Sequence, residues 1–407
     1  MQGQAITQSG GSARWSLIFA SVGHFYFHFF TAMYFTIVLA LSDDWTLPYH
    51  ELISLWTPGA LLVGLVAVPA GKLSDAIGAP LTMLVFFIGM GAACIVCGVV
   101  DGPTALMIGL AGIGLFGAIY HPVGIPWVIQ NAPKNTGKLL AINGVFGGMG
   151  AAAAGSFTGF LVDGFGWRAA FWIPGIVCVA SGVHLALWMA SGRVVRGEPL
   201  LAATHDQSRS DTVRVFAILL VSMFVAGVVY HGIQAAMPKL FTERMPDFVQ
   251  GSVFRAGVLV TIVYVTAAIM QVGGGHLADK YPLKRIYVLC WFVQIGFLAA
   301  LAGATGISAF VFAILLSTVS TGLLPAENML LAKFTPSRHH GLAFGVKFVL
   351  AFGAAPLAME LIAIVHERTG DFFLLIAGMS VATALVFMMC LLLPPDRGPR
   401  PAPVPAE

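Results

Sequence analysis

Long apolar runs alternate with short polar segments along almost the whole chain. A helix needs about 20 apolar residues to cross the hydrocarbon core of a bilayer, and each of these runs is long enough. The pattern predicts an all-α membrane protein with twelve transmembrane helices, over Trp15–Leu41, Glu51–Lys72, Ala79–Val100, Pro103–Val128, Gly137–Val162, Trp167–Ala190, Val213–Phe241, Gly251–Leu277, Leu283–Ala302, Ser308–Leu331, Gly341–Val365 and Phe372–Leu393.

Composition supports this prediction. Hydrophobic residues make up 58% of the 407 residues and charged residues 10%, whereas a soluble domain carries roughly 25% charged residues. So few charges exclude a soluble globular protein of this length. The first apolar run is too long for the core of a signal peptide and lacks a small-residue cleavage site, so we expect it to be retained as the first helix.

The positive charges are unevenly distributed between the two sides of the predicted membrane region. Most lysines and arginines lie in the segments on the side that holds both termini, whereas the other side holds Arg168, Lys239, Arg244, Arg255 and Arg368. Basic loops stay in the cytoplasm. We therefore expect a multi-pass protein of the bacterial cytoplasmic (inner) membrane with both termini cytoplasmic. The net charge of +3 is small, and we expect no nucleic-acid partner.

The chain contains an internal repeat. The segment Gly71-Lys72-Leu73-Ser74-Asp75 aligns with Gly275-His276-Leu277-Ala278-Asp279, 204 positions further on, and the same offset pairs Tyr26 with Tyr230, Gly137 with Gly341, Asn143 with Lys347 and Gly166 with Gly370. A duplicated six-helix unit is typical of transporters that hold substrate between two halves. We predict an N-terminal six-helix half (1–190), a cytoplasmic linker (191–212) and a C-terminal six-helix half (213–407).

The repeated loops resemble the signature loop between helices two and three of the major facilitator superfamily. The resemblance rests on Gly71-x-Leu73-x-Asp75-x-x-Gly78 with its second copy Gly275-x-Leu277-x-Asp279, and on Gly166-Trp167-Arg168-x-x-Phe171. It implies the two-repeat fold of that superfamily and a loop that latches a cytoplasmic gate. In the first copy Ala79 and Pro80 replace the usual basic residues, which predicts a weaker latch. The implied gating residues are Gly71, Asp75, Gly78, Gly275, Asp279, Lys284 and Arg285.

Histidines lie inside the predicted helices, where ionisable groups are unfavourable unless they line a cavity. His24 and His28 are four residues apart and therefore share one face of the first helix. At 1.5 Å per residue from Trp15, His24 lies about 14 Å into the membrane, near its midplane. With polar residues of the fourth and seventh helices they give the first set of substrate or coupling candidates: His24, Tyr26, His28, Tyr120, His121, Tyr230, His231, Gln234 and Met237.

Three roles fit these residues. They are polar groups that line a pore, groups that couple transport to a proton or a metal ion, or hydrogen-bonding groups that hold the helices together. The five cysteines all lie in apolar stretches and predict neither a disulfide framework nor a zinc site. We expect no cofactor, and whether the histidines bind metal stays open.

A second candidate set lies on the tenth and eleventh helices. Glu327 precedes Lys333 by six residues and Lys347 follows Gly341 by six, so the charged pair shares a depth of about 9 Å from the cytoplasmic edge. Since a lone charge is unfavourable in a membrane, we predict that Glu327 and Lys347 form an ion pair, either structural or exchanging partners during transport. Two polar residues complete the set: Asn328 beside Glu327, and Asn143 at the position equivalent to Lys347.

Two branches of the superfamily are similar in local motifs. Gly112-x-Gly114, Tyr120-His121-Pro122 and Gly147-Gly148 resemble the fosmidomycin-resistance efflux branch. A bacterial uptake branch that includes riboflavin and copper importers is similar in Pro325-Ala326-Glu327-Asn328, Thr335-Pro336 and Phe344-Gly345-x-Lys347-Phe348. The methionine pairs expected of copper members are incomplete, because Ile233 stands four residues before Met237.

These features predict a secondary active transporter that moves a small molecule or ion by alternating access. Our main expectation is uptake of a nutrient or cofactor, such as a riboflavin-like aromatic compound or copper. The alternative is proton-coupled drug efflux of the fosmidomycin-resistance type, and a transporter-like membrane receptor is the alternative from another class. The sequence holds no Walker loop and no nucleophile–base arrangement, so we expect no enzyme. We expect a monomer in the bilayer, with a proton as the candidate coupling ion.

Overall fold

The structure, a computed structural model, describes residues 2–131, 136–195, 209–335 and 340–394. These residues form helices joined by short connections. The helices are α1 (Gln2–Trp45), α2 (Tyr49–Ser54), α3 (Thr57–Leu65), α4 (Ala67–Ile77), α5 (Ala79–Val99), α6 (Pro103–Gly117), α7 (Tyr120–Gln130), α8 (Thr136–Phe165), α9 (Trp167–Ala190), α10 (Arg209–Arg244), α11 (Pro246–Val249), α12 (Val253–Lys280), α13 (Leu283–Gly303), α14 (Gly306–Gly322), α15 (Leu324–Phe334), α16 (His340–Thr369) and α17 (Phe373–Leu391).

The predicted all-α fold is confirmed. In the described part of the chain, 11 helical segments are long and apolar enough to cross a membrane, and the pair Tyr49–Leu65 and Ala67–Ile77, bent by 48°, makes up to 12. The predicted span Glu51–Lys72 is thus a broken helix. Large apolar side chains such as Ile108 and Ile307 are 65% and 75% exposed, as expected where lipid replaces water as solvent.

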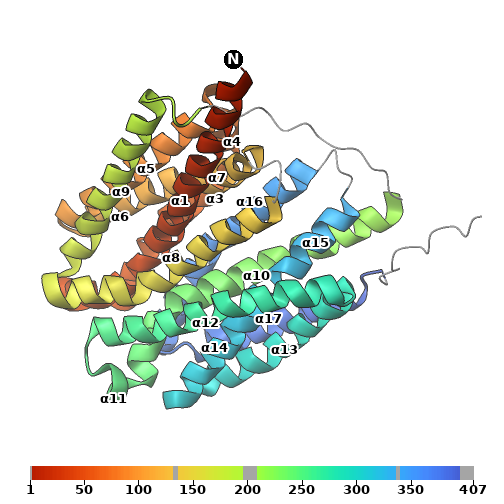
Figure 1. The fold of residues 1–407 in the computed structure, drawn as a ribbon. Coiled ribbons are helices and arrows are strands. Elements are labelled where there is room, and N and C mark those ends of the chain that lie inside the picture. The colour runs from red at the N-terminus through yellow and green to blue at the C-terminus, as the bar shows by residue number, and fades with distance from the viewer. Residues whose placement is uncertain (1, 132–135, 196–208, 336–339, 395–407) are drawn as a thin grey trace, which may run out of the picture.

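The helices form two groups that lie side by side (Figure 1). The first helix group comprises α1–α9 and the second helix group α10–α17. The groups meet where α8 packs against α12, α16 against α2 and α3, and α1 against α10. We name the end of the bundle where α1 begins and α17 ends the terminal face, and the other end the opposite face.

Contacts between the groups are tight toward the opposite face. There the backbones of α8 and α12 approach so closely that a Cβ atom at Gly257 would collide with the carbonyl oxygen of Gly155. Small residues allow this approach between membrane helices. The Thr261 hydroxyl donates to the carbonyl oxygen of Ala152 at 2.6 Å. At the very end, the carboxylate of Asp163 accepts hydrogen bonds from the start of α12.

Two spans are interrupted at equivalent positions. The α6–α7 span breaks just before Tyr120, with Ile119 as the N-cap residue of α7, and the α14–α15 span breaks at Leu323, the N-cap residue of α15. Ile119 and Leu323 are 204 positions apart. Interrupted helices in transporters occur where the chain borders a cavity. Both breaks precede residues that the sequence marks as functional candidates.

The turns at the opposite face repeat at the same offset. Gly102 directly precedes α6 and Gly306 begins α14, with φ of 86° and 55°, and Gly166 and Gly370 have φ of 83° and 66°. Positive φ strains residues that carry a Cβ atom, so glycine is favoured at each turn. The Gly102–Gly306 pair extends the repeat that the sequence motifs indicated.

Candidate functional site

A cavity of about 370 Å³ lies between the two helix groups. Aromatic and small apolar side chains make most of its wall, including Phe27, Trp56, Phe348 and Phe352. Polar side chains project from both groups: His24, His28, Thr31, His121, Tyr230, His231, Gln234, Tyr264, Gln271, Gln294, Ser320, Thr321, Glu327, Asn328 and Lys347. A mainly apolar pocket with a few convergent polar groups is the usual form of a small-molecule site.

Three histidines of the first helix group gather at one wall of the cavity. His24 and His28 come from α1 and His121 from the start of α7, and their ligand nitrogens all lie within 4.8 Å of one another. The ring centroids of His24 and His28 are 5.0 Å apart, and that of His121 is 5.4 Å from the first and 5.7 Å from the second. The sequence predicted that His24 and His28 share one face of the first helix. The structure shows that His121 lies beside them.

Asn143 of α8 holds His24 in place. Nδ1 of His24 lies 2.8 Å from the backbone oxygen of Asn143 and 3.0 Å from its side-chain oxygen. The Asn143 amide also exchanges hydrogen bonds with the Tyr120 hydroxyl, at 2.9 Å and 3.0 Å. Asn143 and Tyr120 are buried behind the histidines and do not line the cavity.

His121 packs across the boundary between the groups. Its ring stacks on Phe348 with centroids 5.2 Å apart and tilts against Phe352 at 4.9 Å. Both ring nitrogens are buried, and neither has a hydrogen-bond partner among the described residues. His121 is the second residue of α7, directly after the break in this span.

The predicted ion pair is present on the wall formed by the second helix group. Nζ of Lys347 lies 2.7 Å from Oε1 of Glu327, and the two side chains are 8% and 2% exposed. Lys347 also donates to Oδ1 of Asn328 at 2.5 Å. The Tyr287 hydroxyl lies 3.3 Å from the other Glu327 oxygen and 2.7 Å from Oγ of Ser222. Each buried charge therefore has an opposite charge and further polar partners, which a low-dielectric site requires.

Of the remaining candidates of the first set, some line the cavity and others do not. Tyr230, His231 and Gln234 line the cavity. Tyr26 points elsewhere, since its hydroxyl lies 3.3 Å from Oγ of Ser181 on α9. Met237 is buried and is not among the lining residues. These two candidates therefore lie outside the cavity in this conformation.

Sequence reasoning missed several polar lining residues on the second helix group. Gln271, Gln294, Ser320 and Thr321 line the cavity, and Oγ of Ser320 donates to Oε1 of Gln294 at 2.9 Å. A usable signal existed, because glutamine inside an apolar span is unfavourable without a partner. Tyr287, which supports Glu327, gave no such signal, since tyrosine is common in membrane helices.

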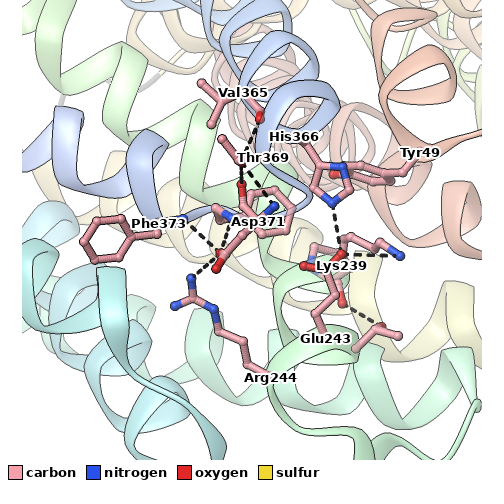
Figure 2. A network of polar contacts seen from close by, with 12 residues as sticks. Tyr49, Lys239, Glu243, Arg244, Val365, His366, Thr369, Asp371 and Phe373 are labelled. Carbon is pink, nitrogen blue, oxygen red and sulfur yellow. Dashed lines mark hydrogen bonds and ion pairs between the residues drawn. The ribbon is translucent and has the colours of Figure 1, made fainter.

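At the opposite face, a polar network connects the two groups (Figure 2). Nε2 of His366 lies 3.0 Å from Oε1 of Glu243, which is also 3.5 Å from Nζ of Lys239. The ring of Tyr49, from the first helix group, packs edge-on against His366 with centroids 5.0 Å apart. Its hydroxyl donates to the carbonyl oxygen of Ala235 at 3.4 Å. The network joins the two helix groups at this end of the bundle.

A second ion pair lies beside this network. The Arg244 guanidinium, 7% exposed, lies 2.9 Å from the carboxylate of Asp371, which is 54% exposed. Partial burial alone would raise the pKa of Asp371, but the hydrogen bond and charge of Arg244, with the backbone amides of Phe372 and Phe373, hold that pKa below its ordinary value. Asp371 is therefore ionised at neutral pH and fixes the turn before α17.

The family model of the Major Facilitator Superfamily matches residues 20–252 and again residues 219–407. The chain belongs to the Major Facilitator Superfamily. This is a family of membrane transporters and not of enzymes, so the protein is a multi-pass secondary transporter of a small solute.

Curated relatives in the superfamily are similar over part of the chain. A probable actinorhodin transporter of Streptomyces coelicolor is 27% identical over 228 residues, which are 51% of this chain and 39% of that relative. The multidrug resistance protein MdtG of Yersinia enterocolitica is 22% identical over 69% of this chain and 70% of its own. A multi-drug resistance efflux pump PmrA homolog of Lactococcus lactis is 24% identical over 68% and 69%. None of the three is named for riboflavin or copper uptake.

Solved structures of the superfamily share the fold. A bacterial homolog of the human lysosomal transporter Spinster, inward-facing and occupied, has a TM-score of 0.74 at 14% identity, over 94% of this chain and 97% of its own. A variant of the peptide transporter POT in complex with sulfate also has a TM-score of 0.74 at 14% identity, over 92% and 93%. At this identity the likeness concerns the fold alone.

The predicted gating residues of this superfamily member lie toward the terminal face. Gly78 ends α4 with φ of 90°, a conformation that glycine adopts without strain. Asp75 and Asp279 are exposed near the ends of α4 and α12. Nζ of Lys284 donates to the Leu391 carbonyl at 2.9 Å, where the end of α17 favours a positive charge. The other gating candidates lie on α4, α12 and α13: Gly71, Gly275 and Arg285.

Proposed function

We propose that this protein is a proton-coupled exporter of small, largely apolar or aromatic solutes, of the kind that confers multidrug resistance. The observation that carries the proposal is the cavity itself, because its aromatic wall encloses a buried carboxylate–ammonium pair. Relatives named for multidrug resistance support it. They favour the efflux alternative over the nutrient uptake that we expected first from the sequence.

The chemistry of the wall fits a flat apolar solute. Phe27, Trp56, Phe348 and Phe352 offer ring faces and edges to the cavity. Aromatic groups bind other rings in stacked or edge-on geometry, and a wall whose surface is mainly apolar discriminates weakly between solutes of similar shape. Weak discrimination is what a multidrug exporter needs.

Glu327 is the residue that we assign to proton coupling. It lies on the cavity wall, with Oε1 2.7 Å from Nζ of Lys347. Protonation of this carboxylate would remove the negative partner and leave Lys347 with Asn328. A buried ammonium without its counter-ion is unfavourable, so protonation biases the protein toward a conformation in which Lys347 is better solvated. A change in protonation is thereby linked to a change in conformation.

The sidedness of the proposal comes from the basic loops. By the rule that basic loops stay in the cytoplasm, we assign the terminal face to the cytoplasmic side of a bacterial inner membrane. Because the contacts around Tyr49 and His366 join the groups at the opposite face, we infer that solute enters this conformation from the cytoplasm. We infer that residues 1–190 and 213–407 rock against each other, joined by the linker 191–212, of which the structure describes residues 191–195 and 209–212.

Transport in inside-out membrane vesicles tests the proposal. Respiration acidifies the vesicle lumen, and an exporter should then accumulate planar aromatic dyes such as ethidium inside. We expect accumulation with the wild-type protein, collapse on adding a protonophore, and loss in Glu327→Gln to the level of vesicles without the protein.

Asp101→Asn is the matched control, since this carboxylate lies on the surface with its side chain 89% exposed. It should transport as the wild type does. Dye uptake driven by the gradient in right-side-out vesicles, or full activity of Glu327→Gln, would overturn the proposal.

A further inference from the structure

We propose that His24, His28 and His121 bind one divalent first-row transition-metal ion of the Zn²⁺ class at the wall of the cavity. Their ligand nitrogens lie within 4.8 Å of one another, although the residues come from two helices that are distant in sequence. This site goes beyond the proposed export function and does not depend on the direction of transport.

The hydrogen bonds of His24 leave one of its nitrogens available to a metal ion. Nδ1 faces two oxygens of Asn143, at 2.8 Å and 3.0 Å. Oxygens accept hydrogen bonds, so Nδ1 carries the proton and Nε2 of the neutral ring keeps its lone pair. Histidine ligands of metals usually donate their other N–H to such an oxygen, which fixes the ring and raises its basicity. Asn143 therefore supplies the outer partner that a metal-binding histidine has.

Gly147 keeps space beside that nitrogen. A Cβ atom at Gly147 would lie 2.6 Å from Nε2 of His24, closer than real side chains approach. Gly147 also lines the cavity. The glycine thus leaves the lone pair of Nε2 uncovered by α8.

His121 provides an independent indication. Both of its ring nitrogens are buried without a hydrogen-bond partner in the described part of the chain. Buried polar atoms in native proteins normally have a partner, and an exception often marks an ion or a water that binds there. A metal ion on either nitrogen would satisfy the ring. The pairing of His24 and His28 on one helix face brings the remaining ligands to the same place.

The donor set indicates the class of metal. Three imidazoles suit Zn²⁺, Cu²⁺ or Ni²⁺, whereas soft Cu⁺ prefers sulfur ligands. Within the described residues, no cysteine, aspartate or glutamate joins the cluster. Zn–N bonds are about 2.0–2.1 Å long, so rotation of the side chains must draw the rings inward when the ion binds. Three protein ligands leave a fourth position, and because all three histidines line the cavity, an oxygen or nitrogen atom of a solute can occupy it.

Metal binding to the purified full-length protein tests the inference. The protein should carry an affinity tag without histidines, so that the tag cannot bind the ion. Equilibrium dialysis against Zn²⁺, followed by elemental analysis, should give one ion per chain. In His121→Asn and His28→Gln the affinity should fall by about 100-fold or more, since loss of an outer partner alone typically costs 10–100-fold.

His184→Asn is the matched control. His184 packs against Trp188 on α9 with ring centroids 4.2 Å apart and does not line the cavity, so its replacement should leave Zn²⁺ binding unchanged. Co²⁺ in place of Zn²⁺ should give the visible absorption of a tetrahedral nitrogen site, lost in the same two variants.

Absence of Zn²⁺ binding by the wild type would overturn the inference. So would equal binding by the wild type and both variants, because the ion would then lie elsewhere. Gel filtration establishes that each variant is folded, and His28→Gln serves alone if His121→Asn aggregates.

Discussion

The two walls of the cavity satisfy a buried polar side chain at equivalent positions of the repeat in different ways. Asn143 and Lys347 are equivalent in the repeat, and both are buried. On the first helix group Asn143 joins His24 and Tyr120 through neutral hydrogen bonds. On the second, Lys347 pairs with Glu327 through full charges.

The difference shows what duplication does and does not determine. The repeat fixes a depth and a direction for each side chain, since equivalent helices cross the bundle in the same way. It does not fix the charge there. A neutral network tolerates the loss of one partner at modest energy, whereas an ion pair in a low-dielectric site makes each partner dependent on the other.

The largest expected effect comes from breaking the pair on one side. In Lys347→Met, the Glu327 carboxylate is left buried without its counter-ion, and removal of one partner of such a pair costs about 3–5 kcal/mol of stability. In the double variant Glu327→Gln, Lys347→Met, no orphan charge remains, and stability should return close to that of the wild type. The stability of the single and of the double variant can be measured by thermal unfolding in detergent and by the yield of folded protein.

Comparison of the two single variants with the double variant also separates a role of the ion pair in stability from a role in transport. If the double variant folds but does not transport dye, the pair has a role in coupling beyond stability. Strictly additive losses of stability would contradict the interaction itself.

A smaller effect is expected at the equivalent neutral position. Asn143→Ala removes the side-chain contacts with His24 and Tyr120 but leaves the backbone oxygen that His24 also contacts. Unsatisfied buried polar groups cost about 1–3 kcal/mol, so the loss should be clearly below that of Lys347→Met in the same unfolding assay.

Asn131→Ala is a suitable control, because this amide makes a local hydrogen bond to the carbonyl of Trp127 at the end of α7. Its stability should stay nearer that of the wild type. If Asn143→Ala were as damaging as Lys347→Met, the two walls would not differ as described.

The smallest effect concerns the Arg244–Asp371 pair, which has the chemistry of the cavity pair but more contact with solvent. Asp371→Asn should cost less than about 1 kcal/mol at neutral pH, because solvent screens a half-exposed carboxylate. The folded-state pKa of Asp371 is lowered, so the stabilisation is complete above its ordinary pKa of about 4 and is lost as pH falls below it.

Unfolding of the wild type and of Asp371→Asn across pH 3–7 tests whether the stabilisation by Asp371 is lost at acid pH. The difference in stability should shrink toward acid pH. A difference that grows on acidification would mean that burial, rather than Arg244, dominates the carboxylate.

Much of this architecture could be predicted from the sequence because each membrane span is a long apolar run of residues. Equal depth on neighbouring helices was enough to predict the contact between Glu327 and Lys347. The helix ends were less predictable: α1 continues beyond Trp15–Leu41 to Gln2 and Trp45. The bend between α3 and α4 at Val66 lies just before Pro69, which has no N–H to donate to the Leu65 carbonyl and so kinks a helix at this point.

The composition of the site was harder to predict than the fold. Every span is apolar on most faces, so periodicity does not say which face meets the cavity. Tyr26, two residues from His24, lies on another face of α1, where its hydroxyl contacts Ser181 on α9. The approach of His121 to His24 and His28 is a contact between α1 and α7, a tertiary feature that no local pattern in either helix predicts.

The carboxylate of Asp163 has a consequence for the balance between conformations. It reaches from α8 to the start of α12, where Ser252 and the amides of Val253 and Phe254 donate to it at 2.6, 3.2 and 3.0 Å. A negative charge at a helix N-terminus contributes about 0.3–1 kcal/mol. If α8 and α12 separate there, both amides pass to water, and a difference of 1 kcal/mol alters the ratio of two conformers about fivefold. One side chain thus shifts the balance between the closed and the separated arrangement of this end by up to about fivefold.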